Sequence, residues 1–322
     1  MKKYALIPLL YLCLACSDDN GITPVDVEII EEEDNDPSLI DDSELNGYSF
    51  KDFHLNNGRM TDSIFYALDG NRIISSTDVQ MNTREINSSE YTYIGSRLTK
   101  IASFYNGEPH YNRTFSYSRD GMTEMRLEVI RNNNSNQYYK YTYTHTADTI
   151  FMALGYGFDN INFTPVDDAK IVLDANDNIV FYENYNYYND RKVHIHTEYD
   201  SNNNPLSEVH KLVEGDSAIP FRSDNIQVGE SQNPLYSVLE ATYGKKTFMM
   251  VYHVQLNDLG KINARTISPN AINSFETNAS ENQFTFEINN EVNEDGFTEF
   301  SSYKTFTQGK LYRHFEIEFI GK

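Results

Sequence analysis

The chain has 322 residues, with 26 Lys or Arg against 48 Asp or Glu, and a formal net charge of −22. Such an acidic chain repels phosphate backbones, which excludes nucleic acid as a partner. Cys13 and Cys16 are its two cysteines, and both lie near the N-terminus. A disulfide framework and thiolate metal sites are therefore excluded from the rest of the chain.

The first element is a short apolar run. Lys2 and Lys3 give a basic start, and residues 5–14 form the apolar core. A helix needs about 20 apolar residues to cross a bilayer, so this run predicts a signal peptide over residues 1–15 rather than a membrane span.

The end of this run carries a modification motif. Leu14-Ala15-Cys16-Ser17 resembles the lipobox of bacterial lipoproteins, although Cys13 stands where that motif usually has leucine. The resemblance implies cleavage before Cys16, acylation of its thiol and anchoring to membrane lipid. The alternative is an ordinary secretory signal in which Cys16 is incidental.

The next three residues, Ser17-Asp18-Asp19, resemble the surface-export signal of Bacteroides-type lipoproteins. That resemblance implies an outer-membrane lipoprotein displayed at the cell surface.

A strongly acidic segment follows. Residues 17–46 contain twelve Asp or Glu and no Lys or Arg. Self-repulsion and scarce apolar surface leave little to offset the entropy of ordering, so we expect residues 16–46 to form an extended tether. An acidic docking tail for a basic partner is the alternative.

Residues 47–322 read as a single all-β domain, in which polar and apolar residues alternate in short Tyr-, Thr- and Phe-rich runs. Examples are Tyr91-Thr92-Tyr93, Phe115-Ser116-Tyr117, Tyr141-Thr142-Tyr143, residues 193–197 and residues 314–319. Turn-forming clusters separate the runs: residues 56–58, 69–71, 132–134, 176–178, 201–204, 258–260 and 308–309. Asn, Asp and Gly accept the positive φ of tight turns, so the pattern predicts a long antiparallel meander of hairpins.

One segment departs from this pattern. Pro234 opens a stretch of ten residues that ends at Tyr243, before Gly244. Proline in the first turn and glycine after the last predict a short helix over residues 234–243.

A loose repeat joins an aromatic strand, a polar turn and an apolar residue that begins the next strand. It occurs at residues 91–101, 115–125 and 197–209, and more weakly at 254–262. These units resemble the tyrosine-aspartate repeats of bacterial wrapping β-sheet proteins, a likeness that carries no chemistry.

A wider resemblance combines these hairpins with the lipobox, the acidic tether and Asn233-Pro234-Leu235-Tyr236. Together they resemble a Bacteroides lipoprotein family of unknown function with a porin-like fold. This resemblance implies a barrel or strongly curved sheet and no particular activity.

A lipid-facing barrel strand needs an apolar residue at every second position. The alternate positions here carry Thr, Lys, Arg, Glu and Asn, as in residues 113–119. We therefore expect a curved sheet or water-soluble barrel, closed against exposed edges, with Tyr, Ile, Leu and Phe inside.

The candidate metal sites are incomplete. His194 and His196 share one strand face, a spacing that can chelate zinc or copper, and His210 on the next strand could approach them. Lone surface histidines are commoner, and we predict neither a metal nor a cofactor. Residues 174–178 and 200–204 faintly resemble calcium loops, but they lack the required Gly and Glu, so hairpin turns explain them better.

Other chemistries leave weak signals. Two tyrosine clusters, at residues 138–143 and 182–188, could stack on sugars, although core packing accounts for them better. Three tripeptides resemble the O-glycosylation acceptor of Bacteroides-type proteins and would modify Ser63, Thr149 and, best placed in a loop, Ser217.

The chain contains no Gly-x-Ser-x-Gly elbow and no phosphate-binding glycine loop. We therefore predict a non-enzymatic lipoprotein whose β domain binds or scaffolds, with a glycan or an outer-membrane protein complex as partner. The alternative is a surface hydrolase that acts on glycans or peptides.

Overall fold

The computed structural model describes residues 45–53, 60–131, 136–186, 191–215, 217–255, 268–279 and 284–321. The strands are β1 (Leu45–Phe53), β2 (Met60–Asp69), β3 (Arg72–Gln80), β4 (Ile86–Ile94), β5 (Arg97–Tyr105), β6 (Glu108–Ser118), β7 (Gly121–Val129), β8 (Gln137–Thr146), β9 (Thr149–Gly157), β10 (Thr164–Leu173), β11 (Ile179–Asn186), β12 (Arg191–Tyr199), β13 (Pro205–Glu214), β14 (Ser217–Gln232), β15 (Asn270–Ala279), β16 (Phe284–Val292), β17 (Thr298–Thr307) and β18 (Lys310–Gly321). Two helices, α1 (Pro234–Tyr243) and α2 (Lys245–Gln255), separate β14 from β15.

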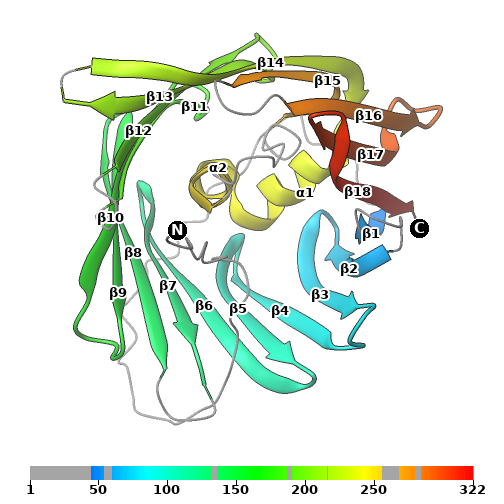
Figure 1. Cartoon of the computed structure of the whole chain (residues 1–322). Helices are drawn as coiled ribbons and strands as arrows, with labels where there is room; N and C mark the ends of the chain where they lie inside the picture. Colours follow the sequence, from blue (N-terminus) through cyan, green and yellow to red (C-terminus); the bar gives the residue numbers. More distant parts are fainter. Residues whose placement is uncertain are drawn as a thin grey trace, which may run out of the picture.

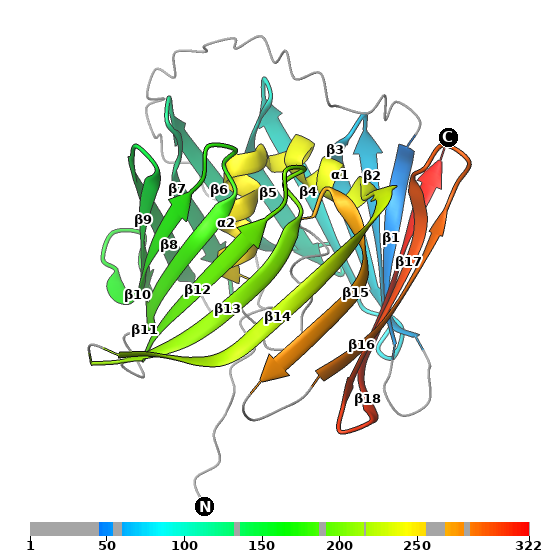
Figure 2. The same cartoon turned by 90° about the horizontal axis from the view of Figure 1, so that it is seen from above.

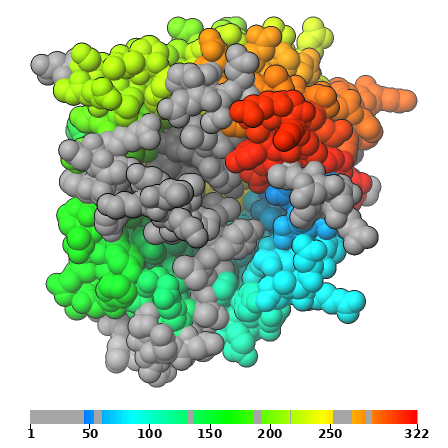
Figure 3. Space-filling model, in the orientation of Figure 1, coloured from blue at the N-terminus to red at the C-terminus, as the bar shows by residue number. Residues whose placement is uncertain are grey.

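These strands form one closed barrel. Each strand pairs antiparallel with the next in sequence, and β18 pairs with β1 to complete an 18-stranded sheet. Figure 1 shows this ring along its axis, and Figure 3 shows β18, in red, against the blue and cyan strands where the ring closes. The predicted all-β meander is confirmed, and of the two predicted forms the barrel is the one observed.

Alternation along each strand decides which side chains face the interior. In β8, Tyr141 and Tyr143 are buried in the core, while Lys140 and Thr142 between them face outward. The expected tyrosine-rich interior is confirmed at these positions.

Bulges near the starts of strands help to curl the sheet. In β5, Leu98 pairs with Tyr93 and Lys100 pairs with Thr92, which leaves Thr99 as an extra residue. The hydroxyl of Thr99 donates to the Thr92 carbonyl at 3.0 Å. An extra residue of this kind bends the strand and increases its twist.

The aromatic residue of the repeated hairpin unit has a specific role. Tyr93, at the end of β4, donates its hydroxyl to the carbonyl of Ile73, the apolar residue that begins the preceding hairpin strand. Tyr117 makes the same bond to Leu98 at 2.9 Å, and Tyr199 makes it to Ile179 at 3.2 Å. Each bond fastens one hairpin to the hairpin before it, which explains the spacing of the sequence repeat.

Helix α1 has the predicted bounds. The Asn233 side chain caps it by accepting from the Leu235 amide, and Pro234 occupies its first turn. Gly244 follows with φ 74°, and its amide donates to the Glu240 carbonyl at 2.7 Å. A left-handed glycine is a common way to end a helix.

Helix α2 was not predicted. It begins directly after Gly244, and Met249, Met250 and Val251 are all buried. Because residues 248–251 are all buried, this run of α2 has no polar position that would reveal a helical period. The expected hairpin copy at residues 254–262 is wrong at its start, since Val254 and Gln255 belong to α2; residues 256–262 lie outside the described part of the chain.

Both helices lie inside the barrel, shown in yellow in Figures 1 and 2. The buried residues of α1 and α2 join the inward residues of the strands in one core. Thr242 of α1 accepts from the backbone amide of Ile73 in β3 at 3.0 Å, and Tyr243 contacts the Phe115 ring of β6 edge-on. Of the helices in the described residues, neither is long and apolar enough to cross a membrane.

The meander gives the barrel two unlike ends. Turns after even-numbered strands, the start of β1 and the end of β18 lie at the end where the chain enters α1, which we call the helix rim. Turns after odd-numbered strands lie at the opposite end, the far rim. Figure 2 shows the barrel from the side with both rims in view.

Candidate functional site

The inner wall carries a buried cluster of four charged side chains on β13 and β14. Their register places Glu208 opposite Asp224 and His210 opposite Arg222, all facing inward. Two nitrogens of Arg222 contact the Asp224 carboxylate: Nε lies 2.9 Å from Oδ1 and Nη2 lies 2.6 Å from Oδ2. His210 Nε2 lies 3.4 Å from Glu208 and 3.6 Å from Asp224.

Burial makes these charges depend on one another. Asp224 is fully buried and also accepts from the Thr277 hydroxyl at 2.8 Å. Burial alone would lower the pKa of His210, but the carboxylates of Asp224 and Glu208 outweigh it, and the pKa is raised. With His210 protonated, two cations balance two carboxylates, as burial requires.

The same cluster has the composition of a metal site. Ligand atoms of Glu208, His210 and Asp224 all lie within 4.8 Å of one another. However, the two-nitrogen contact of Arg222 already neutralises the Asp224 carboxylate. The arrangement is therefore better described as an internal ion-pair network than as a metal centre.

A second inward feature surrounds Arg113 of β6. Its Cζ lies 5.9 Å from the Tyr111 ring centre, and its Nε is buried without a hydrogen-bond partner. Burial opposes its charge, but Tyr111, Tyr243, Tyr141 and Tyr91 raise its pKa overall, so it stays protonated. The residue as a whole keeps partial exposure although it faces inward.

The predicted histidine pair lies on the outer wall. His194 Nε2 is 2.6 Å from the Glu183 carboxylate, and the Phe181 ring contacts both His194 and His196. His210 cannot join them, because it lies opposite Ile195 and shares its inward face. Strand alternation thus separates the three imidazoles that the sequence suggested could meet.

The two calcium-like segments are hairpin turns. Asp174 Oδ1 accepts from the amides of Asn176 and Asn178, at 2.8 and 2.9 Å. Asp200 makes the equivalent bonds to Asn202 and Asn204, both at 2.8 Å. Since the turns' own amides occupy these oxygens, hairpin formation explains them, as predicted.

These turns also connect to one another along the helix rim. The Asn178 amide group donates to Asn203 Oδ1 at 2.9 Å. Asn204 donates to Asn270 Oδ1 at 3.1 Å and accepts from the Asn270 amide at 2.9 Å. Asn204 is 1% exposed and Asn178 fully buried, so the network is part of the core boundary.

The tyrosine clusters divide between the two faces. Tyr141, Tyr143 and Tyr182 are buried inside, whereas Tyr138 and Tyr185 lie on the outward face. Residues 187–190 lie outside the described part of the chain. Core packing accounts for the inward-facing tyrosines, the explanation that the sequence analysis favoured over sugar binding.

The predicted modification sites have different surroundings. Ser63 and Thr149 are half-buried on the outward face of β2 and β9, and Ser217 is exposed at the start of β14. The lipidation and export residues Cys16, Ser17, Asp18 and Asp19 lie outside the described residues, so their roles stay predictions.

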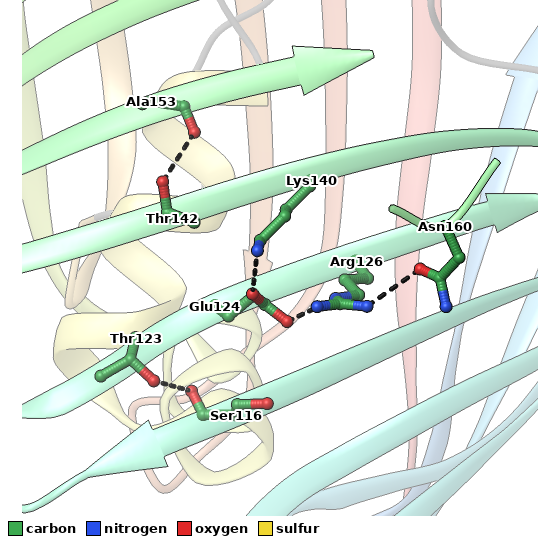
Figure 4. Close-up of polar contacts among 8 residues, drawn as sticks. All are labelled: Ser116, Thr123, Glu124, Arg126, Lys140, Thr142, Ala153 and Asn160. Carbon is green, nitrogen blue, oxygen red and sulfur yellow. Dashed lines mark hydrogen bonds and ion pairs between the residues drawn. The ribbon is translucent and has the colours of Figure 1, made fainter. Parts of the chain in front are cut away.

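Charged pairs occupy the middle of the outward face. On β7 and β8, Glu124 contacts Arg126 and Lys140, and Arg126 donates to Asn160 Oδ1 at 2.9 Å (Figure 4). Burial alone would raise the pKa of Glu124, but the two cations outweigh it and lower the pKa. Outward positions on other strands also carry charge: Lys51, Glu90, Lys100, Lys170, Glu183, Lys192, Lys211, Glu276, Glu287, Lys304 and Glu318.

The described strand pairing is shortest between β15 and β16. Their described pairing is a single position, Glu276 with Thr285, whereas β16 pairs with β17 over nine positions. Asn290 bridges part of the seam by donating its amide to the Ile272 carbonyl at 2.7 Å. An open, polar hollow lies there, lined by Asn273, Asn289 and Glu230 among others.

Comparisons with known proteins give fold-level likenesses only. No protein-family model and no curated protein matches the chain. A porin-like protein from Bacteroides uniformis ATCC 8492 is similar in structure, with 9% identity, coverage of 86% of this chain and 96% of the other, and a TM-score of 0.40. A porin-like protein from Bacteroides vulgatus ATCC 8482 has 16% identity, coverage of 86% and 98%, and a TM-score of 0.39. These scores are too low to support a conclusion about this chain.

Proposed function

We propose that this protein is an outer-membrane lipoprotein, tethered through Cys16, whose water-facing barrel binds a ligand or partner at the cell surface. The observation that carries the proposal is the charged outward face. Glu124, Arg126 and Lys140 lie at mid-strand positions, where an embedded barrel would contact lipid tails.

The cost of such residues in lipid supports this reading. Each Arg or Lys on the lipid face of a barrel costs about 2–4 kcal/mol at the bilayer midplane, and charge recurs here on most strands. A barrel with this wall is stable in water, so an anchor is needed to hold it at a membrane. An acylated Cys16 would supply that anchor.

The interior supports binding over transport and catalysis. Helices α1 and α2 fill part of the barrel, so its interior differs from an open channel. The inward cluster of Glu208, His210, Arg222 and Asp224 is a balanced ion-pair network. Nothing in the described residues specifically favours the hydrolase alternative.

The anchor is tested by Cys16→Ala, with Cys13→Ala as matched control. Wild type and the Cys13 variant should sediment with membranes, because Cys13 leaves with the signal peptide. The Cys16 variant should appear in the detergent-free soluble fraction as a folded protein. A Cys16 variant whose signal peptide has been replaced by a cleavable secretory signal, and which still stays in membranes after an alkaline carbonate wash, would mean an embedded barrel and would overturn the proposal.

Surface display has its own test, protease accessibility on intact cells. The wild-type chain should be cleaved, whereas replacing Ser17, Asp18 and Asp19 by Ala should protect the protein inside the cell envelope. If the wild type and the variant were equally protected from the protease, the proposal of surface display would be wrong.

A further inference from the structure

Arg113 differs from the other inward-facing arginines. Arg222 holds the Asp224 carboxylate at 2.6 Å, and Arg313 holds Asp52 at 3.3 Å. Within the described residues, Arg113 forms no ion pair, and its Nε is buried without a hydrogen-bond acceptor.

An unpaired cation on the inner wall of the barrel lowers the stability of the protein unless an anion binds to it. Stability alone would favour an apolar residue here, since burying an uncompensated charge is unfavourable. The neighbouring strand residues Ile101 and Leu127, which pair with Arg113, are apolar. An anion supplied from outside would satisfy the guanidinium.

The position of Arg113 along β6 separates it from the helices. Along β6, Tyr117 and Phe115 lie nearer the helix rim, where Phe115 contacts Tyr243 at the end of α1. Arg113 is the next inward residue toward the far rim, just beyond that helix contact. A ligand that enters at the far rim would meet Arg113 before it reaches the helices.

We propose that Arg113 binds the carboxylate of an acidic sugar, with the Tyr111 ring beside the sugar ring and the Tyr141 hydroxyl as a hydrogen-bond donor. This proposal deepens the proposed binding function and rests on it. A guanidinium group offers two parallel N–H donors that match a carboxylate. Tyrosine adds a flat apolar face and a hydroxyl donor, which suits a ring that carries hydroxyl groups.

The protonation states agree with this chemistry. Burial raises the pKa of Tyr141 to about 12, so its hydroxyl is a hydrogen-bond donor at neutral pH. Arg113 keeps its charge over the same range. The site therefore offers a cation and neutral hydroxyl groups together.

The test is calorimetric titration of the full-length lipoprotein in detergent with three probes. Trigalacturonic acid has both ring and carboxylate, maltotriose has rings without carboxylate, and citrate has carboxylates without a ring. We expect binding of trigalacturonic acid only. Arg113→Gln should lower the affinity for trigalacturonic acid at least ~10-fold, the loss expected for a charge-assisted bond. The affinity of Arg113→Lys should lie between those of the wild type and Arg113→Gln. Arg119→Gln, in the exposed turn after β6, is the matched control and should bind as wild type.

A melting curve of each variant separates a ligand site from a structural one. Without ligand, Arg113→Gln should melt at or above the wild-type temperature, because it removes an unpaired charge. A lower melting temperature would assign Arg113 a structural role and overturn the proposal. The proposal would also be overturned if trigalacturonic acid did not bind, or if maltotriose bound as tightly as trigalacturonic acid. Citrate binding as tightly as trigalacturonic acid would overturn it too, because Arg113 would then hold an adventitious ion only. The proposed function would fail separately, through membrane retention of the Cys16 variant.

Discussion

Protonation of His210 ties the stability of the inner wall to pH. Glu208 and Asp224 outweigh burial and raise the folded-state pKa of His210 above its usual value of 6.5. A raised folded pKa contributes stability that is fully present below the unfolded pKa and is lost as pH rises through the folded pKa. The wild type should therefore exceed His210→Gln in unfolding free energy most near pH 6, and the difference should shrink toward pH 9 in urea titrations.

His196 provides the control with opposite sign. Burial, together with Lys211, lowers its pKa, so its contribution is present above pH 6.5 and is lost on acidification. The difference between wild type and His196→Gln should thus shrink as pH falls. A pH-independent difference for His210→Gln would contradict the role assigned to the ion-pair network.

The residues of this network show where prediction from sequence stops. His194 and His196 could be placed on one face from their spacing, since alternation within a strand is local. The face of His210 depends on the β12–β13 turn and on the bulge where Tyr199 pairs with Pro205. A one-residue shift in register reverses every face, so the inward cluster could not be read from the chain. Arg113 was likewise unremarkable in sequence, because its lack of a partner is a tertiary property.

Among the turns, Asn204 is the buried link of the helix-rim network. Its side chain donates to Asp200 and Asn270 and accepts from Ser268 and the Asn270 amide. Asn204→Ala should cost about 2–4 kcal/mol in urea unfolding, because several buried polar groups lose their partners. Asn202→Ala, in the same turn but exposed, should stay within about 0.5 kcal/mol of wild type. Equal losses from both variants would show that the network adds nothing beyond the turn.

At the hairpin junctions, the tyrosine hydroxyls should each make a measurable contribution. Tyr117→Phe removes the bond to the Leu98 carbonyl and leaves that carbonyl without this donor, so we expect a loss of about 1–2 kcal/mol. Tyr312→Phe, on an exposed ring of β18, is the control and should be close to neutral. Chemical denaturation compares them, and a neutral Tyr117→Phe would mean that the ring alone joins the hairpins.

The two helices illustrate which elements leave a signal in sequence. Helix α1 has a cap, a proline and a terminal glycine, and all three are local. Residues 248–251 of helix α2 are all buried within the barrel, so this apolar run has no helical period and resembles a strand. Its helical form depends on the space that the closed sheet encloses, which is a property of the whole molecule.

At the scale of the whole barrel, the sequence does not decide whether the sheet closes. Alternation and turns predict a long meander, but a curved sheet and a barrel share that pattern. The choice is made by β1 and β18, which pair from Leu45 with Gly321 to Asp52 with Phe315. Because these strands lie at opposite ends of the described chain, no local motif records their contact.

Closure should also be necessary for solubility. Deleting residues 310–322 removes β18 and leaves β1 and β17 with unpaired edges, which template aggregation. A circular permutant of residues 45–322 is the matched control: a short linker joins the adjacent ends, and new termini open between Asn106 and Gly107 in the β5–β6 turn. The permutant retains every strand pair and should elute as a soluble protein with the wild-type circular dichroism spectrum. The deletion variant should elute as aggregates on size-exclusion chromatography, because the deletion breaks the ring of strands. A soluble, folded deletion variant would instead show that the remaining strands are stable as an open sheet.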